Sequence, residues 1–182
     1  MEPPVSATGL ELRHFTHDDL PGIRPTLIDI FTDAYQDTIE EDEFQQRFPW
    51  FVDHWGGHQD FACVIAYDGD DAIGFAYGAP AVRDREWWRE HLDRAPEPNR
   101  TFSYSELAVR VKWRRRGAAE LLSRTLLDAR SEDLAVLLVD VEHPRVQALY
   151  ESWGFRKVGE RRPFPDSPQF AVMLAELPLQ RA

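Results

Sequence analysis

The 182-residue sequence has one cysteine, Cys63, which excludes an internal disulfide and any zinc site built from several cysteines. Glycine and proline together make up 23 of the 182 residues, too few for a low-complexity or collagen-like chain. No apolar run reaches the 18 residues that a membrane-spanning helix needs, and residues 1–8 lack the basic and apolar blocks of a signal peptide. We therefore expect a cytoplasmic protein with no membrane partner.

Basic residues are also scarce, with 21 Lys and Arg against 32 Asp and Glu, which gives a net charge of −11. A field of that sign repels nucleic acid and favours cationic ligands. The length and the 43% hydrophobic content fit one domain with a sizeable core. We expect this domain over residues 9–178, after a flexible leader (1–8) and before a short tail (179–182).

Hydrophobic periodicity and turn residues predict alternating helices and strands. Helices are expected over residues 20–34, 40–54 (kinked or split by Pro49), 85–92, 117–130 and 144–153. Strands are expected near residues 10–12 and over 61–67, 72–77, 101–111, 135–141, 155–160 and 169–177, with residues 81–100 as an insertion. This order describes an α/β (α+β) fold, a mixed central sheet of about seven strands with helices on both faces.

A basic and small-residue segment, residues 114–119, lies between a predicted strand and a predicted helix. The amides at a helix start are unpaired and carry partial positive charge, and small residues at 117–119 let an anion approach them closely. The pattern indicates a phosphate or pyrophosphate cradle, and it matches neither a Walker loop nor a dinucleotide fingerprint. The alternative is a solvated basic cluster with no ligand.

An aromatic stripe follows in the last predicted helix, where Val146, Leu149, Tyr150 and Trp153 recur at helical spacing. Pro144 suits the first turn of that helix, and Gly154 suits its end. The simplest interpretation of Tyr150 is a buried core aromatic.

Together these two segments resemble the GNAT superfamily of acyl-CoA-dependent N-acyltransferases. Residues 114–119 are similar to the pattern Arg/Gln-x-x-Gly-x-Gly/Ala, with Ala119 in the last place. The pattern A-x-x-L-Y-x-x-x-G-F is met in part by Ala148-Leu149-Tyr150 and Gly154-Phe155. The resemblance is strongest over residues 101–160, and it implies a single-domain GNAT fold.

The resemblance also implies which residues hold acetyl-CoA as co-substrate. The pyrophosphate site would be formed by Arg114, Arg115, Arg116, Gly117, Ala118, Ala119 and Glu120. The strand beside the pantetheine arm and acyl group would be Leu107, Ala108 and Val109, acting largely through the backbone. His143 stands where many relatives have an asparagine that contacts the pantetheine arm.

Two side chains are candidates for the acid–base chemistry of acyl transfer. Tyr150, which resembles the tyrosine of the family's Leu-Tyr pair, is the candidate general acid toward the CoA sulfur, and a backbone N–H near Val109 would polarise the carbonyl. Glu106 is the candidate general base. The alternative for Glu106 is a structural ion pair with Arg110, four residues further along the strand.

The expected activity is transfer of an acetyl group from acetyl-CoA to a primary amine, directly in a ternary complex, with a small molecule as acceptor. A protein or peptide N-terminus is the second acceptor class. An acyl-CoA-binding sensor without turnover is the alternative from a different class of function. The resemblance also implies a homodimer.

Three further features favour structural interpretations. His54 and His58 have metal-ligand spacing, but Gly56-Gly57 interrupts the helix and no third ligand accompanies them, so no metal site is expected. Trp87 and Trp88 either wall a pocket or pin the insertion. The acidic residues near the first helices read more simply as a solvated face than as a trap for a cationic acceptor: Asp37, Glu40, Glu41, Asp42 and Glu43.

Overall fold

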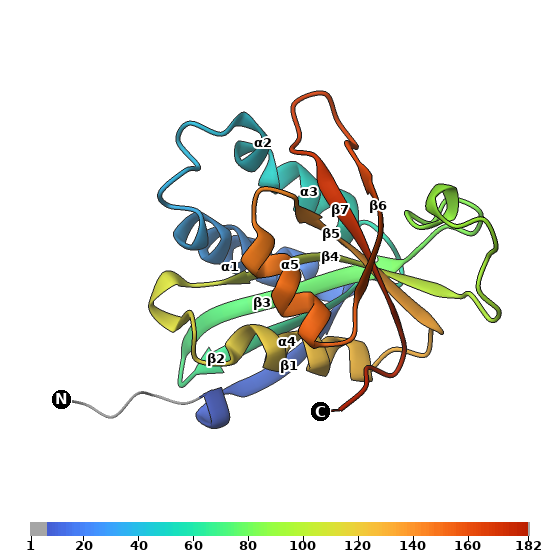
Figure 1. Ribbon diagram of the computed structural model, residues 1–182. Coiled ribbons are helices and arrows are strands. Elements are labelled where there is room, and N and C mark those ends of the chain that lie inside the picture. The colour runs from blue at the N-terminus through green and yellow to red at the C-terminus, as the bar shows by residue number, and fades with distance from the viewer. Residues whose placement is uncertain (1–6, 182) are drawn as a thin grey trace. The chain divides into compact units, whose positions relative to one another are not determined.

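A computed structural model describes residues 7–181, in which seven strands form one mixed sheet (Figure 1). The strands are β1 (Glu11–Thr16), β2 (Ala62–Asp68), β3 (Asp71–Pro80), β4 (Thr101–Val109), β5 (Leu134–Asp140), β6 (Arg156–Arg161) and β7 (Phe170–Glu176). Their order in the sheet is β1-β2-β3-β4-β5-β7-β6. The pair β4–β5 is parallel, whereas β1–β2, β2–β3, β5–β7 and β6–β7 are antiparallel. The expected mixed sheet of about seven strands is confirmed.

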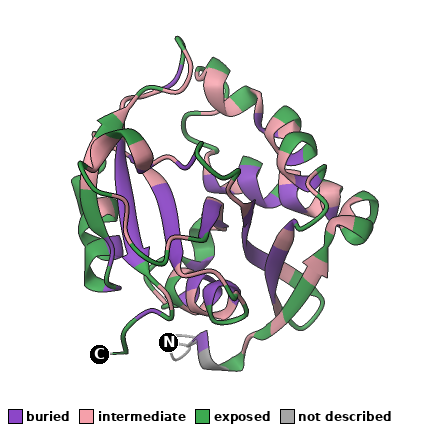
Figure 2. Cartoon of the chain, turned by 90° about the vertical axis from the view of Figure 1, so that its right-hand side faces the viewer, coloured by how far each residue is buried: buried purple, intermediate pink, exposed green. Residues whose placement is uncertain are grey.

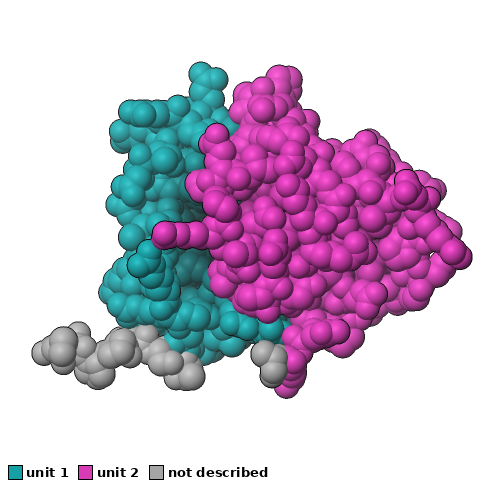
Figure 3. Space-filling view, in the orientation of Figure 1, with its two compact units in different colours: residues 1–78, 106–126 teal, residues 79–105, 127–182 magenta. Residues whose placement is uncertain are grey.

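The helices are α1 (Leu20–Ala34), α2 (Glu43–Gln46), α3 (Phe48–Gly56), α4 (Ala118–Asp128) and α5 (Pro144–Ser152). Short 3-10 turns occur at η1 (Ala7–Gly9), η2 (His17–Asp19), η3 (Arg89–His91) and η4 (Val111–Trp113). Most of the expected leader and the last residue of the expected tail lie outside the described residues. The chain divides into two compact units, with unit 1 formed by residues 1–78 and 106–126 and unit 2 by residues 79–105 and 127–182 (Figure 3).

In unit 1 the hairpin β2–β3 packs against α1 and α3. Because strand side chains alternate between faces, Cys63 and Ile65 of β2 and Phe75 and Tyr77 of β3 enter the same apolar cluster. The helices contribute buried residues at helical spacing: Ile23, Leu27, Ile30, Phe31 and Ala34 from α1, and Phe48 and Val52 from α3. Figure 2 shows these buried strands and inward helix faces in purple. The expected core position of Cys63 is confirmed.

Helix α4 lies on the other face of the same strands. A Cβ added at Gly74 of β3 would lie 3.0 Å from Cδ1 of Leu122 and 3.0 Å from the carbonyl oxygen of Ala108. Glycine is therefore needed at this position for helix and strand to approach so closely. Unit 1 thus has helices on both faces of its strands.

The predicted helix over residues 40–54 is split in two, as Pro49 suggested. Asp42 begins α2, its side chain accepting hydrogen bonds from the amides of Phe44 and Gln45. The chain turns at Arg47, and Pro49 then lies in the first turn of α3, where a missing N–H is tolerated.

Unit 2 is built on the antiparallel strands β5, β7 and β6. Leu134 and Val136 of β5 and Val172 and Leu174 of β7 form one apolar cluster with Trp88 of the insertion. Trp88 is fully buried, whereas Trp87 packs against the same cluster from its edge. The insertion is therefore pinned by Trp88.

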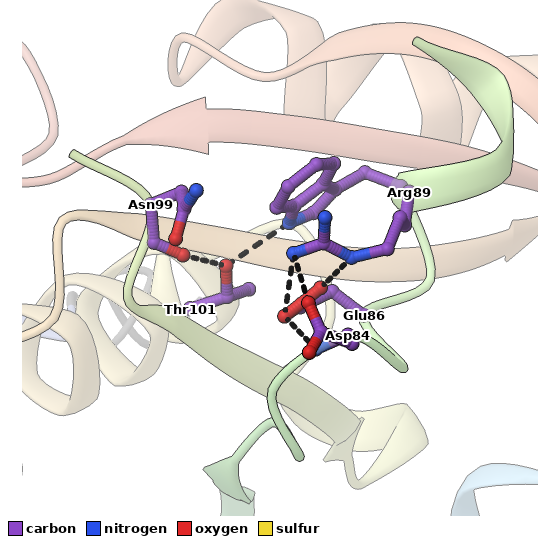
Figure 4. Close-up of polar contacts among 6 residues, drawn as sticks. Asp84, Glu86, Arg89, Asn99 and Thr101 are labelled. Atoms are coloured by element: carbon purple, nitrogen blue, oxygen red, sulfur yellow. Dashed lines mark hydrogen bonds and ion pairs between the residues drawn. The ribbon is translucent and has the colours of Figure 1, made fainter. Parts of the chain in front are cut away.

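Polar contacts fix the same segment (Figure 4). The Trp88 indole N–H donates to Thr101 Oγ1 at 3.0 Å, and the Thr101 hydroxyl donates to the carbonyl of Asn99 at 2.8 Å. The buried Glu86 carboxylate accepts from Arg89 Nε at 2.6 Å and from the amide of Asp84 at 2.8 Å. The predicted helix over residues 85–92 is wrong, since only the 3-10 turn η3 forms there and the side chains bind within the segment.

Helix α5 buries less than its periodicity predicts. Tyr150 is buried, and so is Trp153 just after the helix, whereas Val146 and Leu149 are 42% and 43% exposed. The helix has only nine residues, and its buried contacts lie at its C-terminal turn. The stripe prediction is right for Tyr150 and Trp153 and wrong for Val146 and Leu149.

Candidate functional site

The segment between β4 and α4 has an unusual backbone. Arg115 has φ = +61° and Gly117 has φ = +84°, both in the left-handed region. A left-handed conformation costs a residue with a side chain about 1–2 kcal/mol, so the surrounding structure must hold Arg115 there. Left-handed residues of this kind occur in the tight turns whose successive amides form anion-binding concavities.

Helix α4 begins directly after this turn, at Ala118. The Leu121 amide donates to the carbonyl of Gly117 at 3.1 Å, so the amides of the first turn precede the helical hydrogen-bond ladder. The partial positive charge of the helix start adds to the backbone concavity. The sequence-predicted cradle thus combines a left-handed turn with a helix start, and phosphate binding there stays a prediction.

The three arginines of the loop have different environments. Arg116 lies over the indole of Trp113, with its guanidinium carbon 5.4 Å from the ring centroid, and Arg115 is exposed. Arg114 instead donates a hydrogen bond from Nη2 to the carbonyl oxygen of Ala34 in α1. Its side chain thereby supports the loop from α1, which sequence reasoning did not anticipate.

The other predicted residues of the loop are small or peripheral. Ala118 is buried, and the carbonyl of Ala119 accepts from Ser123 Oγ at 2.8 Å. Glu120 forms a surface ion pair with Arg124 at 2.9 Å. The side chains at 118 and 119 are therefore small, and that of Ala118 is buried.

Glu106 lies on β4, immediately before Leu107, Ala108 and Val109. Burial raises the pKa of its carboxyl group to about 8, and a hydrogen bond from the Leu107 backbone opposes that rise only in part. A carboxyl group with this pKa exchanges its proton near neutral pH, as a general base must.

The structural alternative for Glu106, an ion pair with Arg110, is wrong. Arg110 donates from Nη2 to Asp29 Oδ2 at 2.6 Å and from Nε to the carbonyl of Ala72 at 2.7 Å. Within unit 1 the charge of Glu106 acts on Tyr77 instead, whose pKa is raised first by burial and then by Glu106. Among the described residues the buried Tyr77 hydroxyl has no hydrogen-bond partner, and no sequence pattern marked it.

Tyr150 belongs to unit 2, where three aromatic rings surround it. Its ring makes edge contacts with Trp153, Phe155 and Tyr104, at centroid separations of 5.2, 5.8 and 6.4 Å. These contacts hold the phenol ring in one orientation. His143 precedes α5 with an exposed side chain, its Nε2 3.7 Å from Asp140 Oδ2.

The remaining candidate sites carry little chemistry. His54 and His58 have ring centroids 5.6 Å apart, and residues 7–181 contain no group of three His, Cys, Asp or Glu side chains placed to hold a metal ion. In the acidic patch, Asp42 is the cap of α2 and its neighbours are exposed. None of the helices in the described part of the chain combines the length and apolarity needed to cross a membrane.

Several solved structures share the fold of this chain. A protein described as a GNAT-family acetyltransferase from Desulfovibrio desulfuricans is 17% identical, with a TM-score of 0.66 over 92% of this chain and 98% of that one. The PaiA N-acetyltransferase of Thermoplasma acidophilum, solved with coenzyme A, is 12% identical, with a TM-score of 0.56 over 92% and 98%.

The Escherichia coli ribosomal-protein-S18-alanine N-acetyltransferase is 19% identical, with a TM-score of 0.61 over 92% of this chain and 94% of that one. A comparison with curated protein sequences gives no match. The family model described as the acetyltransferase (GNAT) family matches residues 24–155, which is most of the chain. On this match and on the fold, the chain belongs to the GNAT acetyltransferase family.

Proposed function

We propose that the protein transfers an acetyl group from acetyl-CoA to the primary amine of a small molecule, directly within a ternary complex. The observation that carries this proposal is the backbone cradle formed by Arg115, Gly117 and the start of α4. It follows β4, the strand that carries Glu106, whose half-buried side chain has a carboxyl pKa raised to about 8. Membership of the acetyltransferase (GNAT) family supports the same reaction class.

In this proposal the backbone of the chain binds acetyl-CoA more than its side chains do. The amides of residues 115–120 would bind the pyrophosphate, with Arg115 and Arg116 adding positive charge and Arg114 supporting the loop from α1. The backbone of residues 107–109 would run beside the pantetheine arm, and the His143 imidazole would donate one hydrogen bond to that arm. The bound thioester supplies the activated acetyl group.

The role of Glu106 follows from its raised pKa, and that of Tyr150 from its likeness to the family's Leu-Tyr tyrosine. The Glu106 carboxylate takes a proton from the incoming ammonium group, and the free amine then attacks the thioester carbonyl. The C–S bond breaks as the Tyr150 phenol donates a proton to the departing thiolate, and the Tyr150 phenolate regains a proton from the amide nitrogen, which must lose its second proton as the product forms. With a pKa of about 8, roughly a tenth of Glu106 is ionised at pH 7 and half at pH 8, so the rate should rise through this range.

The test is a thermal shift with acetyl-CoA followed by release of free thiol with a panel of amines. Ligand at a hundredfold excess over Kd should stabilise the folded state by about 2.7 kcal/mol. Tyr150→Phe should slow thiol release and keep the thermal shift. If acetyl-CoA leaves the melting temperature unchanged, the result contradicts both the anion-binding cradle and the proposed activity.

A second acceptor class, the α-amino group of a peptide, has one specific observation in its favour. An α-amine has a pKa near ~8, close to that of Glu106 and well below the ~10 of an alkylamine, so proton transfer to Glu106 is nearly balanced. Peptides with free and blocked N-termini belong in the same panel. A thermal shift without turnover on any amine would instead favour an acyl-CoA sensor.

A further inference from the structure

Helix α1 is joined to the segment that leads into the anion-binding loop. Arg110 donates from Nη2 to Asp29 Oδ2 at 2.6 Å, and the Val111 amide donates to Asp33 Oδ2 at 3.2 Å. One residue further along α1, the carbonyl of Ala34 accepts from Arg114 Nη2. We call Asp29, Asp33 and the Ala34 carbonyl the α1 clamp.

The α1 clamp joins one face of helix α1 to residues 110–114. Asp29 and Asp33 are four residues apart and so lie on one face of the helix. Arg110 is also fixed to the β2–β3 hairpin, since its Nε donates to the carbonyl of Ala72 and its amide to that of Ile73. Residues 110–114 are therefore held from two sides immediately before the left-handed Arg115.

The clamp contributes little to overall stability. The Asp29 side chain is 71% exposed and that of Arg110 is 27% exposed, and ion pairs at such surfaces are worth about 0–1 kcal/mol. The pair borders an open hollow of about 660 Å³, whose other walls include Pro25, Asp71 and Lys112. Removing the Asp29 carboxylate should therefore leave the apolar core of unit 1 intact.

The strain in the loop supplies a reason for these contacts. A left-handed arginine persists only where its neighbours determine the backbone, and the clamp holds the residues just before it. We propose that Asp29 and Asp33 are positioning residues for donor binding, which keep residues 110–114 in place so that the loop retains its anion-binding conformation. The proposal rests on the proposed function and adds two acidic residues that touch no substrate.

The sign of the effect separates this role from simple electrostatics. Deleting a carboxylate near an anion site should tighten anion binding, because it removes repulsion. The clamp predicts the opposite, a loss of about 5–10-fold in acetyl-CoA affinity for Asp29→Ala and for Asp33→Ala. In steady state the KM for acetyl-CoA should rise by the same factor, with kcat within about twofold.

Two further variants serve as controls for titration calorimetry with acetyl-CoA. Asp18→Ala removes an exposed carboxylate of unit 1 outside the clamp and should leave affinity unchanged or slightly tighter. Asp33→Asn keeps an oxygen that accepts from the Val111 amide, so it should restore most of the affinity lost in Asp33→Ala.

Each outcome has one meaning. If the wild-type protein fails to bind acetyl-CoA, the proposed function is wrong. If it binds, and Asp29→Ala and Asp33→Ala match Asp18→Ala, the clamp is overturned while the function stands. If Asp33→Ala does not fold, Asp29→Ala and Asp33→Asn decide: the clamp requires weaker binding in the first and near-normal binding in the second.

Discussion

The pKa values of two glutamates are shifted in opposite directions by their surroundings. Glu86 lies in the insertion and Glu106 lies on β4. Burial alone would raise the pKa of Glu86, but hydrogen bonds from Arg89 and from the Asp84 backbone lower it. Burial raises the pKa of Glu106 to about 8, with only the Leu107 backbone in opposition. The two carboxyl groups differ in their access to a cation. Glu86 accepts from Arg89 at 2.6 Å, whereas Arg110, the arginine nearest to Glu106 in the sequence, is bound to Asp29 instead.

The presence or absence of a cation decides what each glutamate can do. A carboxylate held by a guanidinium stays ionised throughout the neutral range, and its hydrogen bonds fix the segment around it. A carboxyl group buried without a cation keeps its proton until mildly alkaline pH and can exchange it with a substrate. Glu86 therefore fixes the structure of the insertion, whereas Glu106 has the raised pKa that its proposed role as proton acceptor requires.

The largest expected effect is on catalysis, from Glu106→Gln. The amide has a similar shape and cannot accept a proton, so kcat/KM should fall by about 100-fold or more at pH 8. The wild-type rate should rise with pH to a plateau above an apparent pKa of about 8, and the variant should lack this rise. Acetyl-CoA binding by calorimetry should be unchanged, and a variant with the wild-type pH profile would exclude Glu106 as the base.

The same substitution should change how stability depends on pH. The folded-state pKa of Glu106 is raised above its unfolded value of 4.5, so between about pH 4.5 and 8 the folded state binds the extra proton. Stability from this group is therefore complete below pH 4.5 and declines as pH rises, by up to about 1.4 kcal/mol per pH unit. Urea unfolding across this range should show a smaller decline for Glu106→Gln than for the wild type.

Glu86 should behave in the opposite sense, because its folded-state pKa is lowered. Its contribution is present above the unfolded pKa of 4.5 and is lost as pH falls through the folded value. At pH 7, Glu86→Ala should lower the free energy of unfolding by about 2–3 kcal/mol, since Arg89 and the Asp84 amide lose their acceptor. Thermal unfolding measures the loss, and turnover per folded molecule should stay at the wild-type value.

Most of the architecture could be predicted from the sequence because it follows from local patterns. The Asp-Gly turn and two apolar runs specify the β2–β3 hairpin, and Pro49 specifies the break between α2 and α3. Gly117 and the small residues after it specify a tight turn into the start of α4. These features depend on residues close together in the chain.

The rest depends on contacts between distant residues, which a single sequence does not display. Residues 85–92 have helical spacing, but only a 3-10 turn forms there. The Trp88 side chain hydrogen-bonds to Thr101, and Glu86 and Arg89 pair with each other. Arg110 lies four residues from Glu106, yet it pairs with Asp29, 81 positions away. The same holds for Asp33 and the Val111 amide, so the α1 clamp could not be read from spacing.

The smallest expected effect concerns the indole that anchors the insertion. Trp88→Phe removes the N–H that donates to Thr101 Oγ1 at 3.0 Å and leaves a small void among Leu134, Val136 and Val172. The Thr101 hydroxyl keeps its bond to the Asn99 carbonyl, so the loss should be about 1–2 kcal/mol. Trp87→Phe, at the partly buried neighbour, is the matched control and should cost less. Equal losses in the two variants would mean that both indoles anchor the insertion to unit 2. Trp88 would then have no special role in holding the segment that contains Glu86 and Arg89.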